Sequence, residues 1–495
     1  MIVQPRSRHR ALAAFLSFLF PGLGQAYAGN RRLAALLALP VALLVVLVLI
    51  ALAIGGRQTM NTFLSASFLT ALIGLDLGLM VWRLFAIAQA GLPLPAVPPT
   101  LVAPAPDDGH ATRRIGSTLL VLVLLLATVG MHAWAGMVVG ELNATLEDVF
   151  GGNTGGGGAG APTPHGGVNG GPLNQPEFAW DGTERINFLL LGIDAGGQRT
   201  EALTDTILMV SIDPVAKSAV MVSVPRDTGF MPLPDRSMYP EGVYPKKINT
   251  LSTEASLDPA RWCPDLPADA GEACGLRTLE RSVSLYLGVP IQYYATIDLE
   301  GFTQLIDAVG PLRLCLDGTL NDPTYLGPGD TWTHRTGVTL EAGCHDDYDG
   351  QYALAYARAR KGTLTMPDGT VQQLTDFMRA ERQQELLLEL RREFAKLDLI
   401  FELPDTLRAV GTTVVTDFPR DKAGDLASLL PLITGDDIRR VVLGLPRFVD
   451  PPLDPLNNYI LTPRRDDIRR QMERLFGADQ LQGWYVASDA LGPDV

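Results

Sequence analysis

The sequence predicts an α/β domain, with helices flanking a mixed central sheet, preceded by an N-terminal α-helical membrane region with several spans. Two observations predict this architecture: apolar residues are concentrated in the first 140 of the 495 positions, and short β-rich runs alternate with helical patterns after residue 183. We therefore divide the chain into a membrane region, a linker, an α/β domain and a tail, at residues 1–140, 141–182, 183–480 and 481–495.

The membrane region contains three apolar segments with almost no charge, at residues 33–54, 63–81 and 115–139. Each is long enough to cross a hydrocarbon core of ~30 Å as a helix. A fourth apolar segment, 11–28, is broken by a Pro-Gly-Leu-Gly sequence and flanked on both sides by arginines. Because positive charge stays on the cytoplasmic side, we expect this segment to dip into the membrane and return.

The same charge rule predicts the topology of the whole chain. It places the N-terminus in the cytoplasm and everything after about residue 140 outside the cytoplasm. No cleavable signal is evident, because the early apolar run lacks a credible small-residue cleavage site. We therefore expect a protein of the cell membrane whose extracytoplasmic α/β domain remains anchored.

All four cysteines lie in the part of the chain predicted to be extracytoplasmic: Cys263, Cys274, Cys315 and Cys344. An even count in an oxidising compartment indicates two disulfides, and we favour Cys263 with Cys274 and Cys315 with Cys344. The sequence alone leaves three pairings open, and four free buried thiols are the alternative. A zinc site is disfavoured because the chain has no Cys-x-x-Cys pair and its nearby histidines lack a matching spacing.

A glycine-rich stretch at residues 151–176 has the composition of a flexible linker, and the α/β domain begins after it. The domain opens with three strand-like runs, at residues 186–193, 206–212 and 219–224. If hairpins connect them, the chain runs up, down and up again. Three charged side chains then emerge at one edge of the sheet: Asp194, Asp205 and Arg226.

The rest of the domain is predicted to alternate between helices and strands. A helix at residues 277–287 ends at a glycine, which suits the left-handed end of a helix. A strand, a helix and a second strand follow at 291–298, 299–309 and 311–316, and we expect the two strands to pair in parallel. A long helix at 379–397 has apolar residues on one face, so it can pack on the sheet.

The edge of the first three strands offers a candidate metal site, at Asp194 and Asp205 beside Arg226. Mg²⁺ prefers one or two protein carboxylates, with water and the substrate's phosphate oxygens as its other ligands. Two carboxylates next to an arginine therefore predict Mg²⁺ beside a bound phosphate. The alternative is an aspartate-rich turn that caps strands and binds nothing.

Four arginines fall within 25 residues of a chain whose net charge is −14: Arg358, Arg360, Arg379 and Arg382. The first two are two apart, so an extended segment would point them the same way, and the last two share a helix face. Guanidinium groups pair with phosphate oxygens, which predicts a multiply charged phosphate as the ligand. An alternative of equal weight is a solvated, salt-bridged helix face, since three glutamates lie nearby.

Seven sequence blocks follow one another in the α/β domain, at residues 189–194, 204–207, 223–228, 247–249, 298–302, 353–360 and 376–384. In content and order they resemble the LytR-CpsA-Psr (LCP) family. The resemblance covers roughly residues 184–400, and a weaker tail extends it to about residue 475. Each block alone is weak evidence for the resemblance, whereas seven blocks in the family's order are not expected by chance. The resemblance implies an LCP-like fold for this domain.

The resemblance also implies a membrane-anchored, extracytoplasmic, Mg²⁺-dependent phosphotransferase. Such enzymes move a glycopolymer from a polyprenyl pyrophosphate carrier onto a peptidoglycan hydroxyl, through a phosphodiester link, and release polyprenyl phosphate. The implied partners are the lipid-linked glycopolymer, peptidoglycan and membrane lipid. This fits the residues, because a metal and arginines neutralise charge on a transferring phosphoryl group while positioning supplies most of the catalysis.

By position, the resemblance implies roles for the candidate residues. Asp194 and Asp205 match metal-associated aspartates, and Arg226 matches the arginine of a Pro-Arg-Asp motif. Asp227, the next residue, is a weaker candidate to help the acceptor hydroxyl lose its proton, or else holds Arg226 in place. Six basic residues are assigned to the pyrophosphate site: Arg199, Lys247, Arg358, Arg360, Arg379 and Arg382.

The chain departs from the family's usual pattern in three respects. Two positions where many members carry arginine are Ala195 and Leu203 here, and Arg199 in the same loop is a candidate substitute. A cysteine-bearing insertion occupies residues 257–275, and three membrane spans are more than the family's usual one. These differences leave the core chemistry in place and put acceptor and polymer specificity in doubt.

A second hypothesis is a non-catalytic, polyprenyl-phosphate-binding regulator of the cell envelope. The same arginines would then hold the lipid without turning it over. Regulation through DNA contact is disfavoured, because the arginines are predicted to lie outside the membrane and the soluble part carries no basic recognition helix. We therefore expect no nucleic acid partner.

Overall fold

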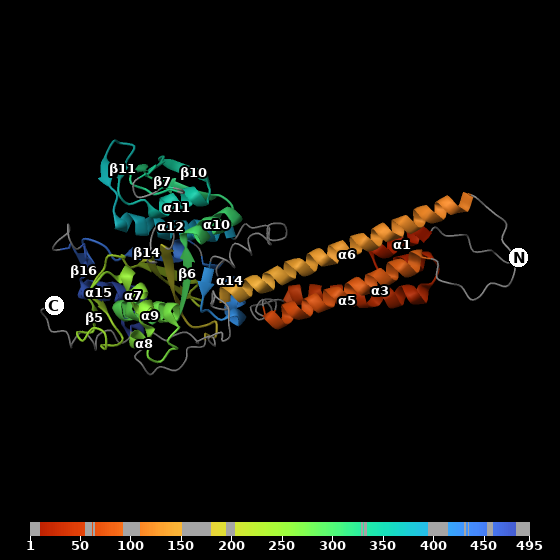
Figure 1. The fold of residues 1–495 in the computed structure, drawn as a ribbon, viewed down its shortest axis with the longest axis horizontal. Helices are drawn as coiled ribbons and strands as arrows, with labels where there is room; N and C mark the ends of the chain where they lie inside the picture. The colour runs from red at the N-terminus through yellow and green to blue at the C-terminus, as the bar shows by residue number, and fades with distance from the viewer. Residues whose placement is uncertain are drawn as a thin grey trace. The chain divides into compact units, whose positions relative to one another are not determined.

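The computed structural model describes residues 10–54, 62, 65–92, 109–150, 180–194, 203–327, 330, 334–394, 414–429, 432–433, 435–452 and 459–481. The chain divides into two compact units, residues 1–143 and residues 144–495. Figure 1 shows the first as a set of long helices and the second as a mixture of helices and strands.

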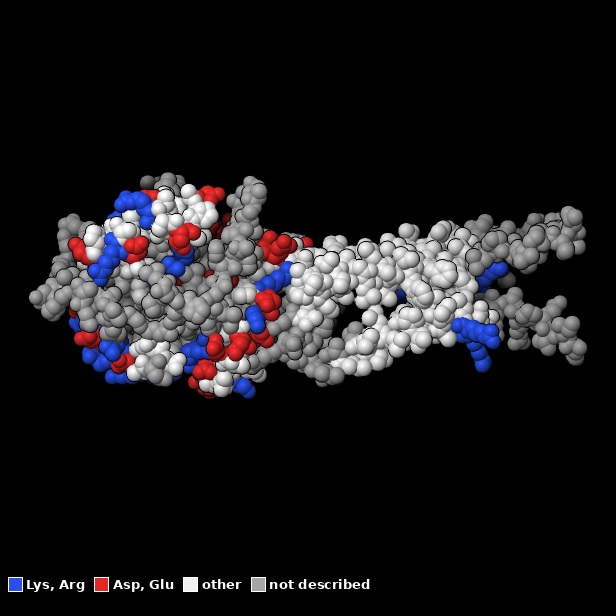
Figure 2. Space-filling view, turned by 90° about the horizontal axis from the view of Figure 1, so that it is seen from below, with Lys and Arg blue, Asp and Glu red and all other residues white. Residues whose placement is uncertain are grey.

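The first unit contains, within the described residues, α1 (Arg10–Leu19), α2 (Leu23–Tyr27), α3 (Arg31–Ile54), α5 (Ala66–Gly91) and most of α6 (Gly109–Phe150). Two of the described helices are long and apolar enough to cross a membrane, judged by length and composition: α5 and the part Gly116–Phe150 of α6. α3 covers the remaining predicted span and contains Pro40. Figure 2 shows few charged side chains along the helices of this unit.

The predicted break in the first apolar segment lies where it was expected. α1 ends at Leu19 and α2 begins at Leu23, with Gly22 in a left-handed conformation (φ 101°) that glycine adopts without steric cost. α2 packs closely on α1, since a Cβ on Gly24 would lie 2.0 Å from the carbonyl oxygen of Ala13. The segment is therefore a bent helix pair, and its depth in a membrane stays a prediction.

α6 is longer than the predicted span and carries a polar contact. It continues to Phe150, so that residues 141–150, assigned above to the linker, are helical, while 151–179 lie outside the described residues. His132 Nδ1 of α6 lies 2.7 Å from Asp76 Oδ1 of α5. Polar side chains between apolar helices contact one another where their apolar surroundings offer no other partner. This contact therefore aligns α5 with α6.

The second unit is built on a six-stranded sheet with the strand order β13-β6-β1-β2-β3-β14. Its strands are β1 (Ile186–Asp194), β2 (Leu203–Asp213), β3 (Ser218–Ser223), β6 (Tyr293–Asp298), β13 (Val414–Thr416) and β14 (Ile438–Val442). β1 pairs with β2 and β2 pairs with β3, both antiparallel, as the predicted hairpins require. β6 pairs with β1 and β14 pairs with β3, both in parallel. The sheet is mixed, which confirms that part of the predicted fold class.

Helices lie on both sides of this sheet (Figure 1): α7 (Leu251–Leu257), α8 (Pro259–Trp262), α9 (Gly271–Leu287) and α15 (Arg465–Phe476) on one, and α10 (Leu299–Val309), α11 (Gly350–Arg358) and α12 (Asp376–Phe394) on the other. On the first side, α9 and α15 bury Leu279 and Met472 in one core with Leu189 of β1. On the second side, Gln384 of α12 donates to Ser223 Oγ of β3 at 2.9 Å. The predicted helix cover is thus present.

One predicted strand pairing is wrong. β7 (Leu312–Leu316) does not pair with β6; it pairs antiparallel with β10 (Gly343–Tyr348), outside the central sheet. The reason is that β7 alternates between buried and exposed residues, with Arg313 and Cys315 on the exposed face. A parallel strand covered by helices on both faces needs apolar residues on both. The short β13 occupies the place beside β6 instead.

A smaller sheet with the order β12-β11-β8-β9 completes this side of the unit. Its strands are β8 (Thr319–Asp322), β9 (Val338–Leu340), β11 (Thr363–Thr365) and β12 (Val371–Gln373). Leu320 and Leu340 of this sheet share a core with Tyr356 of α11, so the sheet supports the end of that helix. Other short strands and α-helices in the described part of this unit are β4 (Met231–Pro232), β5 (Val243–Tyr244), α14 (Ala423–Leu429), β15 (Val449–Asp450) and β16 (Thr462–Pro463).

Both favoured disulfides are present. Cys263–Cys274 links the end of α8 to the beginning of α9, within the insertion. Cys315–Cys344 joins residues that lie directly opposite each other in β7 and β10. The favoured pairing is confirmed, and the alternative of free thiols is wrong, because all four cysteines are bonded.

The burial of Leu189 predicts a large cost when its side chain is truncated. Leu189 is 0% exposed in the central sheet, whereas Leu257, at the end of α7, is 78% exposed. We expect Leu189→Ala to lower the free energy of unfolding of the second unit by about 3 kcal/mol, through lost apolar contacts and a cavity. The matched control, Leu257→Ala, should cost less than about 0.5 kcal/mol. Guanidinium unfolding followed by tryptophan fluorescence measures both, and equal costs would contradict this assignment of the core.

Candidate functional site

The charged residues at the strand ends lie together, as the hairpin arrangement predicts. Asp194 is the last residue of β1, Asp205 lies near the beginning of β2, and Arg226 follows the end of β3. Because the three strands are antiparallel neighbours, these positions share one edge of the sheet. Arg226 Nη1 donates to Asp205 Oδ1 at 2.8 Å and to Asp205 Oδ2 at 2.7 Å. This ion pair joins the ends of β2 and β3.

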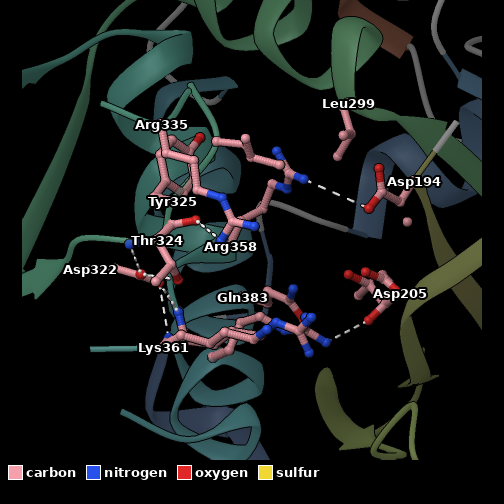
Figure 3. A pocket seen from close by; sticks show the side chains of 15 residues that line it. Asp194, Asp205, Leu299, Asp322, Thr324, Tyr325, Arg335, Arg358, Lys361 and Gln383 are labelled. Atoms are coloured by element: carbon pink, nitrogen blue, oxygen red, sulfur yellow. Dashed lines mark hydrogen bonds and ion pairs between the residues drawn. The ribbon is translucent and has the colours of Figure 1, made fainter. Parts of the chain in front are cut away.

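A pocket lies at this edge of the sheet, and acidic and basic side chains face one another across it (Figure 3). The sheet contributes Asp194 and Asp205. The opposite wall is basic, with residues from the loop after β8, the end of α11 and α12: Arg335, Arg358, Arg360, Lys361 and Arg379. Segments far apart in the sequence therefore build a single cationic wall opposite two carboxylates.

The end of α11 places Arg358 and Arg360 in the pocket. Arg358 is the last residue of this helix, so the expectation of an extended segment is wrong here. Arg358 Nη2 lies 3.7 Å from Asp194 Oδ2, and its guanidinium lies over the ring of Tyr325. Arg360 Nη1 lies 3.5 Å from Asp376 Oδ1. Both ion contacts are longer than the roughly 2.7–2.9 Å of a strong charged hydrogen bond.

Asp322, at the end of β8, shapes the turn that carries Arg360. Its Oδ2 accepts hydrogen bonds from the backbone N–H groups of Arg360 and Lys361, both at 2.9 Å. Its Oδ1 accepts from the backbone N–H and the hydroxyl of Thr324 at 3.0 and 2.9 Å. Asp322 is 3% exposed, and three of the four hydrogen bonds that its oxygens accept come from backbone N–H groups. It is a positioning residue for the cationic wall.

Arg379 and Arg382 share a buried face of α12, being 4% and 8% exposed, so the alternative of a solvated helix face is wrong for this pair. Arg379 lines the pocket, and its Nη2 donates to the carbonyl oxygen of Asp205 at 2.8 Å. Arg382 is not among the described residues that line the pocket. Its Nε donates to Tyr356 O at 2.8 Å and its Nη2 to Ala359 O, so it satisfies carbonyl groups at the end of α11.

An ion network surrounds Arg226 beside the pocket. Its Nε lies 3.8 Å from Asp227 Oδ2 and 3.6 Å from Asp376 Oδ1, in addition to the contacts of Nη1 with Asp205. Asp227 Oδ1 accepts a hydrogen bond from Lys247 Nζ at 2.7 Å. Lys247, predicted for the pyrophosphate site, thus pairs with Asp227. Asp227 thus lies between two cations, a geometry suited to holding Arg226 in place.

Burial raises the pKa of both Asp205 and Asp376, but the neighbouring charges lead to net shifts in opposite directions. At Asp205 burial raises the pKa, but the charges of Arg226 and Arg379 outweigh it, so that the pKa lies below its ordinary value. At Asp376 burial prevails over the same two arginines, and the charges of Asp227 and Asp205 add to it, so that the pKa lies above its ordinary value. Of these two carboxyl groups, Asp376 takes up a proton more readily.

The LytR_cpsA_psr family model matches residues 168–446, more than half of the chain. The chain belongs to the LytR_cpsA_psr family. Two curated relatives are each named polyisoprenyl-teichoic acid--peptidoglycan teichoic acid transferase TagU. The one from Halalkalibacterium halodurans is 26% identical over 244 residues, covering 49% of this chain and 64% of the relative. The one from Oceanobacillus iheyensis is 29% identical over 241 residues, covering 48% and 61%. The chain thus spans less than two thirds of these relatives' length.

Solved structures also resemble this family member. A crystal structure of Bacillus subtilis TagV has a TM-score of 0.42 and 20% identity, and the match covers 59% of this chain and 97% of that one. A structure of TagT bound to LIIa-WTA has a TM-score of 0.43 and 19% identity, covering 63% of this chain and 96% of the other.

The pocket of this LytR_cpsA_psr member offers two carboxylates that could hold a metal, Asp194 and Asp205. No group of three or more His, Cys, Asp or Glu side chains in the described part of the chain is placed to hold one. Mg²⁺ fits such a sparse donor set, because it keeps several waters and binds the substrate's phosphate oxygens. Asp205 remains suitable, since its Oδ2, which accepts from Arg226, has a second lone pair.

Residues of the site that were not predicted as site residues include Arg335 and Lys361 of the cationic wall, together with Asn249, Asp322 and Asp376. Asn249 Nδ2 lies 3.4 Å from Asp205 Oδ1, and its place in a family block was an available signal. Asp376 begins α12 three residues before an arginine, a spacing that brings the two side chains together on a helix. No local sequence pattern identifies Asp322 as a residue of the site. Arg199, a predicted site residue, lies outside the described residues.

The contacts of Arg382 predict that it stabilises the fold. Arg382→Lys replaces a guanidinium that reaches two carbonyl groups by a single ammonium, which should cost about 1–3 kcal/mol of unfolding free energy. Arg392, near the end of the same helix, has a side chain 60% exposed, and Arg392→Lys is the matched control with a nearly unchanged unfolding midpoint. If Arg382 instead binds the ligand, Arg382→Lys would leave the unfolding midpoint unchanged and weaken pyrophosphate binding.

The lowered pKa of Asp205 predicts a pH-dependent contribution to stability. Its folded-state pKa lies below the unfolded value of roughly 3.9, so the stabilisation is complete above that pH and is lost as the pH falls through the folded-state pKa. The stability difference between the wild type and Asp205→Asn should therefore be constant from neutral pH to about pH 5 and shrink below about pH 4. Urea unfolding midpoints measured across this range test it, and a difference that persists at the lowest pH would refute it.

Proposed function

We propose that this protein is a membrane-anchored, extracytoplasmic phosphotransferase. It moves a glycopolymer from a polyprenyl pyrophosphate carrier onto a peptidoglycan hydroxyl. The acceptor oxygen bonds to the sugar-linked phosphorus, the bond from that phosphorus to the bridging oxygen breaks, and the acceptor proton is released. The products are a phosphodiester between polymer and peptidoglycan, and polyprenyl phosphate.

The observation that carries this proposal is the meeting of Arg358, Arg360 and Arg379 in one pocket with Asp194 and Asp205. Figure 3 shows Arg358 and the two aspartates facing one another. A pyrophosphate group carries several negative charges, and guanidinium groups bind its oxygens through paired hydrogen bonds. The same cations offset charge that develops on the transferring phosphoryl group and on the leaving oxygen. The pocket is thus suited to phosphoryl transfer.

The three arginines support different parts of this task. Arg379 is nearly buried and fixed to the carbonyl oxygen of Asp205, while its Nε has no hydrogen-bond partner among the described residues. A buried donor without a partner is costly, and a phosphate oxygen would satisfy it. Arg358 and Arg360 are each about one quarter exposed, at 27% and 25% of the side chain, so they can follow the position of the ligand.

Magnesium is part of the proposal. Asp194 and Asp205 are the residues that would hold it in the pocket. When bound there, Mg²⁺ would neutralise charge on the phosphate oxygens and orient the reacting group. Arg226 contributes by fixing both oxygens of the Asp205 carboxylate, which keeps this ligand in one orientation.

The setting of the domain supports the same function. The apolar helix α5 and the apolar part of α6 support membrane anchoring. Two disulfides in the second unit support an oxidising, extracytoplasmic location. The TagU relatives are named as transferases of teichoic acid to peptidoglycan, which supports a glycopolymer donor and a peptidoglycan acceptor for this chain.

Transfer by the detergent-solubilised full chain tests the proposal directly. With lipid pyrophosphate-linked glycan, Mg²⁺ and a soluble peptidoglycan fragment, we expect release of polyprenyl phosphate and a new phosphodiester, both measured by mass spectrometry. Arg226→Lys supplies one point charge in place of a planar guanidinium, and should lower kcat by about 100-fold. Binding of the lipid should be retained, because the pocket arginines are unchanged. Arg313→Lys, at a side chain 61% exposed, is the control and should transfer normally.

The outcome also separates the enzyme from the alternative of a non-catalytic regulator. Lipid that binds with the expected affinity and stays intact in the presence of the acceptor and Mg²⁺ would favour the regulator. Failure of the chain to bind the lipid would contradict both functions.

A further inference from the structure

A half-exposed tyrosine lies beside the ion network of Arg226. The ring of Tyr459 is contacted by Lys247, whose Nζ lies 5.7 Å from the ring centroid, and 39% of Tyr459 is exposed. The same ammonium group donates to Asp227 Oδ1 at 2.7 Å. Tyr459 thus stands at the end of a series of contacts that begins in the pocket at Asp205 and passes through Arg226, Asp227 and Lys247.

The backbone next to Tyr459 is fixed to the segment that carries the Pro-Arg-Asp motif. The N–H of Leu461 donates to the carbonyl oxygen of Asp227, and the N–H of Gly229 donates to the carbonyl oxygen of Leu461, both at 2.9 Å. A Cβ on Gly229 would lie 2.3 Å from Ile460 Cγ2, so glycine at this position leaves room for the Ile460 side chain. The backbone at Leu461, two residues after Tyr459, is therefore anchored before any ligand arrives, which limits the entropic cost of ordering this segment on binding.

The chemistry of Tyr459 suits a sugar ring. Its aromatic body is apolar and its hydroxyl is polar, so that one side chain offers both a packing surface and a hydrogen-bond donor. Burial and the charges of Asp227 and Asp376 raise the pKa of Tyr459, so the phenol stays protonated at neutral pH and can donate. A pyranose presents an apolar face of C–H groups and a polar rim of hydroxyls, which matches this combination.

The position of Tyr459 suits the acceptor better than the donor. Tyr459 and Lys247 are not among the described residues that line the cationic pocket, which the pyrophosphate would occupy. In phosphoryl transfer the attacking and leaving oxygens lie roughly in line on opposite sides of phosphorus. The acceptor therefore needs a subsite separate from that of the lipid carrier, and close to the same charged network.

We propose that Tyr459 forms an acceptor subsite, on which a pyranose of the peptidoglycan glycan strand stacks while its hydroxyls reach the edge of the Arg226 network. The proposal rests on the function proposed above and names where its acceptor binds. Tyr459 is a specificity-determining residue in this assignment.

Direct binding tests the subsite without turnover. The probe is a soluble tetramer of β-1,4-linked N-acetylglucosamine, titrated calorimetrically into the detergent-solubilised full chain. Tyr459→Ala should raise the Kd about tenfold, because ring contact is lost, and Tyr459→Phe should stay within about threefold of the wild type. Tyr352→Ala is the matched control, since Tyr352 is 50% exposed and stacks on Tyr348 at 5.4 Å. Inorganic pyrophosphate should bind all four proteins equally.

Kinetics distinguish the subsite from a structural role. In the transfer assay Tyr459→Ala should raise the acceptor KM by about tenfold and leave the donor KM and the pH profile of kcat unchanged. If Tyr459 only holds Lys247, the pH profile would shift while the Kd of the tetramer stays the same, and the subsite would be refuted. Equal tetramer affinity in the wild type and Tyr459→Ala, with normal transfer by the wild type, would also refute the subsite alone. Tetramer binding that depends on Tyr459, in a chain that transfers nothing, would contradict the proposed function and leave the glycan site standing.

Discussion

The ion pair between Arg226 and Asp205 is the constraint on which the rest of the site depends. Their side chains are only 11% and 19% exposed, and charges so far removed from water need partners. The pair fixes the ends of β2 and β3. Arg379 donates to the carbonyl oxygen of the same aspartate, which attaches α12 to this point, and Asp376 at the start of α12 approaches Arg226. The sheet edge and the helix that build the pocket thus meet at one ion pair.

α12 contributes to the pocket in two ways. Arg379 enters it directly, whereas Arg382, on the same helix face, holds the end of α11 through the carbonyl groups of Tyr356 and Ala359. α11 ends at Arg358, which also lines the pocket, so Arg379 lines the pocket itself while Arg382 positions another lining residue. Packing of α12 and formation of the cationic wall are therefore structurally linked, and a change that loosens α12 should affect both.

The sequence predicted those parts of the structure that follow from local pattern and simple geometry. Strands β1 to β3 are apolar runs separated by turns, and antiparallel order alone brings Asp194, Asp205 and Arg226 to one edge. The alternation within β7 disfavours a central parallel strand, but its actual partner, β10, was not predictable in this way, because a five-residue run does not specify which strand it joins. The contacts of Arg382 depend on where α11 ends, and Asp322 bonds to backbone 38 residues away. Such contacts arise only from tertiary packing.

Contact lengths divide the arginines into those that maintain the structure and those that can bind a ligand. The 2.7 Å contact of Arg226 with Asp205 is short and largely buried, so a phosphate would have to displace a strong partner to use it. Arg358 and Arg360 lie 3.7 and 3.5 Å from their aspartates and are more exposed, so they lose little when they turn toward a phosphate. The acidic partners keep these cations close together before a ligand binds. Under the proposed function, a pyrophosphate would meet cations that are already assembled, which is the form of preorganisation that electrostatic catalysis requires.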